Sequence, residues 1–198
     1  MFRAGLTAVV GSAHESFDVN DVRAMALWLR CLMVGFGFFY ASLVIAEDAY
    51  WARATRVSDG DTLWVQPVSG GAPRKLRLQG LDAPELCQAG GPAAREALRA
   101  LVAQRVLKVR VKYTDDYGRG LASIEADGQD LAAQMVRSGQ AWSYRWRRSP
   151  GPYARQEAQA RKARAGLFAQ AAPELPSDFR KRNGSCYLPD AQGKFKLK

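Results

Sequence analysis

The sequence has almost no histidine: among its 198 residues there is only His14, in a segment that we expect to be absent from the working protein. This scarcity argues against Ser/His triads, Cys/His nucleophiles and histidine-ligated zinc. Any catalysis by this chain is therefore expected to come from carboxylates, arginines and a bound metal ion.

Acidic residues are also few relative to basic ones. The chain has 29 Lys and Arg residues against 19 Asp and Glu residues, a net charge of +10. Residues 1–46 contribute three of each sign, so the whole excess lies beyond them. A polyanionic partner such as nucleic acid would explain this excess, and so would a basic surface that only keeps the protein soluble. The apolar fraction of 47% is ordinary for a globular domain.

One long apolar run, residues 31–46, lies near the amino terminus and follows the segment 25–30. A basic residue before an apolar run that ends on small residues is typical of a cleaved secretory signal. The run is shorter than the roughly 20 residues that a membrane-spanning helix needs, and an uncleaved anchor over residues 25–46 is the alternative if Arg30 reaches the membrane interface. We therefore expect a periplasmic or secreted protein, and interpret residues 1–24 as an untranslated or disordered extension.

Cysteine is scarce as well, with three residues in the chain. Cys31 would leave with the signal, so the exported chain keeps Cys87 and Cys186. Two cysteines in an oxidising compartment favour a disulfide, which would tie the carboxyl-terminal tail beside the acidic loop that precedes Cys87. The alternative is two free thiols.

Period-two alternation between turn signals predicts five short strands. The first three, separated by Asp-Gly and Gly-Gly turns, form a meander, and the last two form a hairpin. In the third strand Arg77 lies on the face opposite its neighbouring leucines, available to a cleft. In the fourth, Val109, Val111 and Tyr113 share one face. The predicted strands cover residues 51–57, 62–68, 74–81, 106–114 and 121–126.

Three helices are predicted between and after these strands. Pro92 opens the first, which carries one apolar stripe; Gly139 ends the second, and the third covers residues 153–169. Five strands with a helix between the third and fourth follow the order of an OB-type barrel, so we expect an α+β fold, a five-stranded OB-type β-barrel with three helices. This domain would span residues 47–170, and the basic tail, residues 171–198, has no periodicity from which to assign an element.

Two aspartates are candidate ligands of a hard cation. Asp61 and Asp82 lie at predicted strand ends beside turns, and the backbone carbonyl of Ala83 could add another oxygen. Ca²⁺ takes about six to eight oxygen ligands from carboxylates, carbonyls, water and substrate, which suits this set. The alternative role is turn formation, since Asp-Gly and Asp-Ala-Pro are common turn sequences.

Three more charged residues could act on a phosphodiester. Glu85 could align an attacking water or accept its proton. Arg77 and Arg119 could bind the phosphate with paired N–H donors and stabilise the charge that develops during attack. A guanidinium releases its proton poorly, so both arginines are assigned electrostatic roles. Alternatively these are a solvated loop carboxylate and two surface arginines. Together with the aspartates, they predict a metal-dependent nuclease.

From about Ala52 to Ala169 the chain closely resembles the staphylococcal-type thermonuclease family. The resemblance implies a Ca²⁺-dependent nuclease that cuts DNA and RNA and leaves 3′-phosphate ends. It places metal ligands at Asp61, Asp82 and the carbonyl of Ala83, the water-activating carboxylate at Glu85, phosphate-binding arginines at Arg77 and Arg119, and a nucleotide-facing tyrosine at Tyr117; Gly166-Leu167-Phe168-Ala169 matches the end of the last helix.

A second substrate tyrosine is expected in the stretch from Ala141 to Trp146, where we assign it to Tyr144. Aromatic residues there interleave with arginines, the mixture that stacks bases and follows a strand's phosphates; core packing of the aromatics is the alternative. Two positions depart from the family pattern. Ala83 stands where threonine is common, but only its carbonyl is needed. Asp116 is acidic where a lysine can sit, which would weaken contact with the nucleic-acid backbone near Tyr117.

These observations predict an exported, monomeric nuclease with Ca²⁺ as cofactor and DNA and RNA as partners, single strands preferred and no protein partner evident. Little base specificity is expected, because phosphate contacts carry affinity without reading sequence. Two alternatives stay open. One is a catalytically silent OB-fold module that only binds nucleic acid, and the other is a nuclease anchored to a membrane through residues 25–46.

Overall fold

The computed structural model describes residues 49–184, 186–189 and 195–197. The predictions for residues 1–46, an extension followed by an export signal or anchor, lie outside the described residues. Within the described ranges, no helix is long and apolar enough to cross a membrane.

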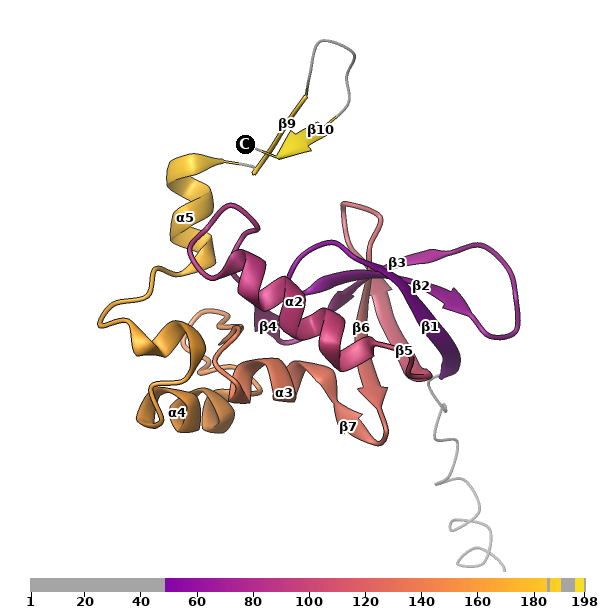
Figure 1. Ribbon diagram of the computed structural model, residues 1–198, viewed down its shortest axis with the longest axis horizontal. Helices are drawn as coiled ribbons and strands as arrows, with labels where there is room; N and C mark the ends of the chain where they lie inside the picture. The colour runs from indigo at the N-terminus through magenta and orange to yellow at the C-terminus, as the bar shows by residue number, and fades with distance from the viewer. Residues whose placement is uncertain (1–48, 185, 190–194, 198) are drawn as a thin grey trace, which may run out of the picture. The chain divides into compact units, whose positions relative to one another are not determined.

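Five strands close into a barrel, as predicted (Figure 1). The order is β3-β2-β1-β5-β6-β7, and a parallel pairing between β3 and β6 closes the ring. The predicted α+β fold with an OB-type barrel is thereby confirmed. The strands are β1 (Tyr50–Val57), β2 (Thr62–Pro67), β3 (Arg74–Leu78), β5 (Leu107–Thr114) and β6 (Gly120–Ala126), with the short β7 (Gln129–Asp130) beside β6.

Alternation along the strands fills the barrel interior. Leu63 pairs with Leu76 between β2 and β3, Val109 pairs with Ile124 between β5 and β6, and all four side chains are almost fully buried. Arg77, between two buried leucines, lies on the other face of β3 and is half-buried. Period-two geometry thus directs apolar groups inward and this arginine outward, as the sequence predicts.

The first two predicted helices are present. In Figure 1, α2 (Gly91–Val102) lies across the barrel, and its buried face carries Ala94, Leu98 and Val102. The shorter α3 (Leu131–Arg137) is capped by Asp130, whose side chain accepts hydrogen bonds from the backbone N–H groups of Ala132 and Ala133.

The third predicted helix is shorter than expected. α4 spans Ala154–Lys162, and a separate 3₁₀ turn, η1, covers Gly166–Ala169. Arg164 and Gly166, with φ of 49° and 52°, interrupt the helix between them. A side chain at Gly166 would clash with the backbone of the loop after α3, so this close approach requires glycine. The interruption lets Phe168 pack in a second, smaller hydrophobic cluster.

The described residues form four α-helices rather than the three predicted, because α5 (Pro176–Asn183) lies in the tail to which no element was assigned. Its sequence is almost entirely polar and carries no apolar stripe of the kind that predicts a helix. Pro176 at its start is buried, and Cys186 after its end is bonded to Cys87. Anchoring at both ends therefore accounts for a helix that local sequence does not favour.

Two small sheets complete the fold. β9 (Tyr187–Pro189) pairs with β10 (Phe195–Leu197) beyond α5. β4 (Leu81–Asp82) pairs antiparallel with β8 (Trp142–Ser143), which sets Asp82 opposite Trp142. Beside this pairing, the backbone N–H of Tyr144 donates to the carbonyl of Gly80 at 2.9 Å. The acidic loop and the aromatic stretch, far apart in sequence, are therefore neighbours.

Candidate active site

Asp61 and Asp82 converge on one guanidinium. Arg77 Nη1 donates to Asp61 Oδ1 at 2.9 Å, and Arg77 Nη2 lies 2.7 Å from Asp61 Oδ2 and 3.0 Å from Asp82 Oδ1. The side chains of Asp61 and Asp82 are only 5% and 10% exposed. The two carboxylates that the sequence assigns to a cation thus meet around one half-buried positive charge.

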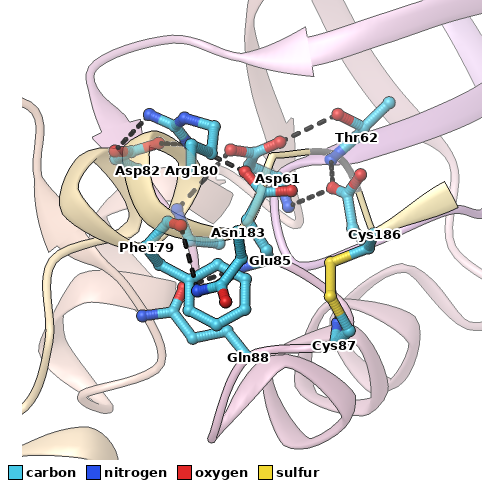
Figure 2. A network of polar contacts seen from close by, with 12 residues as sticks. Asp61, Thr62, Asp82, Glu85, Cys87, Gln88, Phe179, Arg180, Asn183 and Cys186 are labelled. Atoms are coloured by element: carbon cyan, nitrogen blue, oxygen red, sulfur yellow. Dashed lines mark hydrogen bonds and ion pairs between the residues drawn. A yellow bond between two sulfur atoms is a disulfide. The ribbon is translucent and has the colours of Figure 1, made fainter. Parts of the chain in front are cut away.

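The turn before β2 is stabilised by Asp59 rather than by Asp61. Asp59 Oδ1 accepts hydrogen bonds from the backbone N–H groups of Asp61 at 3.0 Å and of Thr62 at 2.7 Å. This is the turn chemistry that was the alternative role for Asp61. Burial, together with the charge of Asp61, raises the pKa of Asp59 to about 7. Asp61 itself pairs with Arg77. It accepts a further hydrogen bond from the Thr62 hydroxyl at 2.8 Å (Figure 2).

Burial shapes the electrostatics of this cluster. It raises the pKa of Asp82 above its usual value, although the guanidiniums of Arg180 and Arg77 act in the opposite direction. Burial alone would lower the pKa of Arg77, but the carboxylates of Asp61 and Asp82 raise it above its ordinary value. A carboxylate whose charge is disfavoured by burial is stabilised by any further cation nearby. The cluster is therefore suited to a cation in addition to its arginines.

Glu85 is held on a tightly packed loop. Its backbone N–H donates to the side chain of Gln88 at 3.1 Å, and its carbonyl accepts from the backbone N–H of Gln88 at 2.8 Å. A side chain at Gly91, the first residue of α2, would clash with the carbonyl of Glu85. The Glu85 carboxylate, 29% exposed, pairs with Arg180 Nη1 at 2.8 Å. Glu85 is therefore not the freely solvated loop carboxylate of the alternative interpretation.

One open cleft of about 720 Å³ brings most of the predicted site residues together. Asp61 and Asp82 do not line it but contact Arg77, which does. Ala83, 4% exposed, lies next to them, with its backbone N–H 3.5 Å from Asp61 Oδ2. The predicted residues that line the cleft are Arg77, Glu85, Tyr117, Arg119 and Tyr144.

Arg119 is oriented by the turn that precedes it. Asp115 Oδ2 accepts from Arg119 Nε at 2.9 Å, and Asp115 Oδ1 accepts from the backbone N–H groups of Tyr117 and Arg119. Partial burial would raise the pKa of Asp115, but these hydrogen bonds outweigh it and lower the pKa below its usual value. The Arg119 guanidinium lies 5.1 Å from the centre of the Tyr117 ring. Tyr117 is 81% exposed and Asp116 is also exposed, so the tip of the turn presents these two side chains to solvent.

Comparison with known proteins identifies the family. The model of a family described as staphylococcal nuclease homologue matches residues 75–170. An uncharacterized endonuclease of Haemophilus influenzae is 34% identical over 130 residues, which make up 66% of this chain and 72% of that protein. An uncharacterized endonuclease of Escherichia coli O157:H7 is 32% identical over 146 residues, 73% of this chain and 94% of that protein. The chain belongs to the staphylococcal nuclease homologue family.

Family membership confirms the resemblance deduced from the motifs. The matched range contains Arg77, Asp82, Glu85 and Arg119, while Asp61 precedes it. A probable staphylococcal-like nuclease of Oryza sativa subsp. japonica is 40% identical over 113 residues, 56% of this chain. This chain spans about a third of that longer relative, 34% of its length.

The oxygen donors at the site fit the Ca²⁺ that the staphylococcal nuclease homologue family implies. Arg77 Nη2 lies within 3.0 Å of both Asp61 and Asp82, so both carboxylates can reach one positive charge. No group of three or more His, Cys, Asp or Glu side chains with the arrangement of a metal site occurs in the described ranges. Carbonyls, water and substrate would have to supply the remaining ligands, a mixture that hard cations such as Ca²⁺ accept.

The aromatic stretch of this family member divides between core and surface. Trp142 is 2% exposed and packs edge-on against Phe168, with 5.9 Å between ring centres. Tyr144 and Trp146 are 44% and 63% exposed, and Tyr144 lines the cleft. Core packing, the alternative for the whole stretch, therefore applies to Trp142, while Tyr144 is accessible to a substrate.

A buried carboxylate on α4 positions this stretch. Glu157, whose side chain is 3% exposed, accepts from the backbone N–H of Ser143 at 2.9 Å. It also pairs with Arg145 at 2.6 Å and with Arg161 at 2.8 Å. Glu157 thereby fixes β8 just before Tyr144. Its burial was not predicted, because a lone glutamate on a polar helix gives no local sign of it.

Replacing Glu157 by alanine should lower the free energy of unfolding by about 2 kcal/mol, since the buried N–H of Ser143 loses its acceptor. Urea unfolding measures this change. Glu96 on α2 is the matched control, because its side chain is 53% exposed and pairs with two arginines of its own helix. Glu96→Ala should change stability by less than about 0.5 kcal/mol. Equal losses in the two variants would contradict the role given to Glu157.

Tyr113 is a cleft residue that the sequence analysis placed incorrectly. It was predicted on the same face of its strand as Val109 and Val111, but a register shift follows Val111 in the β5–β6 pairing. Tyr113 is 55% exposed and lines the cleft. An irregularity of this kind turns the strand and redirects the side chains after it, which alternation alone does not predict.

Arg180 is the second cleft residue that was missed. Its helix has no periodic signal, so no local pattern indicated it. The predicted disulfide between Cys87 and Cys186 was the feature of the sequence that placed the tail near the acidic loop. In the structure those two cysteines are bonded, with an S–S distance of 2.11 Å.

Proposed function

We propose that this protein is a Ca²⁺-dependent nuclease that hydrolyses phosphodiester bonds of DNA and RNA and leaves 3′-phosphate ends. The observation that carries the proposal is the shared cleft. Glu85, Arg77 and Arg119 line it together, and Arg77 also contacts the two buried carboxylates of Asp61 and Asp82. The relatives in H. influenzae and E. coli O157:H7, both named as endonucleases, support the same reaction class.

Each residue has a role that its chemistry supports. Glu85 aligns a water molecule against the phosphorus and accepts its proton. Arg77 and Arg119 bind the phosphate oxygens and stabilise the charge that develops on them during attack. Neither arginine is assigned a proton-donating role, because a guanidinium keeps its proton at any working pH.

Asp61, Asp82 and the carbonyl of Ala83 would hold Ca²⁺. Bound there, the ion supplies positive charge that polarises the phosphate and orients the attacking water. The arrangement of the carboxylates around one guanidinium supports this assignment, since Arg77 occupies a position that favours a positive charge.

Exposed tyrosines around the cleft support a nucleic-acid substrate. Tyr117, Tyr144 and Tyr113 are 81%, 44% and 55% exposed and line the same cleft. Aromatic faces stack on bases of any sequence, and unpaired bases are free to do so, which supports single strands as the preferred substrate. The chain would act as a monomer with little base preference.

Export is part of the proposal. A disulfide joins Cys87 and Cys186, and such bonds persist in oxidising compartments such as the periplasm or the extracellular medium. Residues 25–46 would serve as the signal, cleaved or retained as an anchor.

The direct test incubates the purified protein with end-labelled single-stranded DNA and RNA in Ca²⁺ and in chelator. We expect cleavage that requires Ca²⁺ and products whose 3′ ends accept a nucleotide from a terminal transferase only after phosphatase treatment. DNA that is bound but stays intact under all conditions would instead favour the catalytically silent binding module. DNA that is neither cut nor bound would contradict both.

A further inference from the structure

We propose that Arg180 on α5 is a third phosphate-binding arginine of this active site, and that the Cys87–Cys186 disulfide keeps it there. The proposal deepens the proposed function and rests on it. In Figure 2, Arg180 reaches from α5 to Asp82 and Glu85, and the disulfide joins the segment after α5 to the acidic loop.

The guanidinium of Arg180 contacts both acidic residues of the loop. Its Nη1 lies 2.8 Å from Glu85 Oε1 and its Nη2 lies 3.2 Å from Asp82 Oδ2. Although it pairs with the Asp82 and Glu85 carboxylates, 40% of its side chain is exposed. Arg180 lines the cleft together with Arg77 and Arg119. A phosphate that enters the cleft would therefore meet three guanidiniums rather than two.

The neighbouring basic residues of α5 are placed differently. Lys181 and Arg182 are 78% and 67% exposed and pair with Asp178 and Glu174. Neither lines the cleft. The basic composition of the tail therefore does not by itself explain Arg180, whose position is specific to one face of the helix.

Anchors at both ends of α5 fix this position. Before the helix, the side chain of Gln88 donates to the carbonyl of Glu174 at 2.7 Å. After it, the disulfide binds Cys186 to Cys87, and Cys186 Sγ lies 3.0 Å from the backbone N of Cys87. Gln88 and Cys87 belong to the loop that carries Glu85. The helix is thus fastened at each end to the catalytic loop itself.

This double attachment favours a resident binding residue over a removable block. A helix that covered the site and had to leave before substrate bound would need to detach, and a covalent bond to the catalytic loop prevents that. The side chain of Arg180, 40% exposed, can still change its rotamer while the helix stays attached. With five N–H donors in a rigid fork, it can keep contact with Glu85 and still donate to a phosphate oxygen.

The test compares Arg180→Gln, Arg180→Lys and Lys181→Gln. Lys181→Gln is the control, because it removes one positive charge from the same helix at a position outside the cleft. Two quantities are measured: the KM for single-stranded DNA in Ca²⁺, and the Kd for a fluorescent oligonucleotide in chelator, where no cleavage occurs. We expect Arg180→Gln to raise both about tenfold, the effect of losing one charged hydrogen bond.

Arg180→Lys should recover part of the loss, since it restores the charge without the fork, and Lys181→Gln should resemble the wild type. Thermal unfolding of each variant shows whether α5 stays folded. The Cys87→Ser/Cys186→Ser variant should weaken binding as Arg180→Gln does, and adding Arg180→Gln to it should have little further effect.

Three results would overturn the inference. Faster cleavage or tighter binding by Arg180→Gln would identify Arg180 as a block, unchanged values would remove it from the site, and additive losses with the serine variant would separate it from the disulfide. Failure of the proposed function looks different. In that case the wild type would not cleave DNA, while its binding in chelator would still reveal whether Arg180 contacts phosphate.

Discussion

Replacing Glu85 by glutamine should lower kcat about a hundred- to ten-thousandfold while the protein stays folded. Glutamine matches the shape of glutamate and can still accept a hydrogen bond from Arg180, which pairs with Glu85 at 2.8 Å in the wild type. It cannot accept a proton from the attacking water. The loss should therefore appear in the chemical step, and we expect KM and the Kd for an oligonucleotide in chelator to change little.

The matched control for this variant is Glu125→Gln. Glu125 has a similar exposed fraction, 32% against 29%, and likewise pairs with one arginine, Arg110, at 2.9 Å. It lies on β6 and does not line the cleft. Glu125→Gln should retain wild-type kcat. Wild-type kcat in Glu85→Gln would show that Glu85 does not activate the water.

Replacing Arg77 by glutamine should affect both activity and stability. We expect kcat to fall about a hundred- to a thousandfold, because the developing phosphate charge loses a preorganised donor. Arg77 also separates two buried carboxylates, at 2.7 Å from Asp61 and 3.0 Å from Asp82. Without it they face each other, and we expect the free energy of unfolding to fall by about 3 kcal/mol, the lower end for a broken buried pair because Arg180 still contacts Asp82.

Calcium should reverse part of this destabilisation. In Arg77→Gln the charge of Arg77 no longer neutralises Asp61 and Asp82, so a bound cation would contribute more to their neutralisation than in the wild type. Ca²⁺ should therefore raise the Tm of Arg77→Gln more than that of the wild type. Differential scanning fluorimetry over a Ca²⁺ series measures the two shifts. Arg110→Gln, which removes the ion pair between Arg110 and Glu125, is the control, and its Tm should shift with Ca²⁺ as that of the wild type does. A smaller shift in Arg77→Gln than in the wild type would mean that the two aspartates do not bind the cation.

The barrel could be predicted because its signals are local. Each signal spans only a few residues, as in the Asp-Gly and Gly-Gly turns and in the alternation around Leu76 and Leu78. The structure has the predicted strand order. The acidic loop could be predicted for the same reason, since Asp82 and Glu85 are three positions apart in one turn. Ion pairing between Arg77 and Asp61 follows from adjacent strands, because Arg77 lies opposite Thr62 in the β2–β3 pairing.

Other features depend on contacts between distant parts of the chain. The predicted third helix ends early because Gly166 must fit against the backbone near Gly139. A register shift in the β5–β6 pairing redirects Tyr113 into the cleft. Neither effect leaves a mark in the periodicity of the segment concerned, because each arises from packing against another element.

Local residue patterns were thus enough to predict the α+β barrel, the cleft residues Arg77, Glu85 and Arg119, and the resemblance to the family. The closure of the barrel was decided by the pairing of β3 with β6. The fourth helix and its arginine were not accessible in this way. Arg180 is 95 residues from Glu85 and 98 from Asp82 in sequence, on a polar helix with no apolar stripe. Its position comes from a disulfide and a side-chain hydrogen bond to the acidic loop. Both contacts join residues that are far apart in sequence, so the free energy with which they stabilise the helix cannot be predicted from the pattern of neighbouring residues.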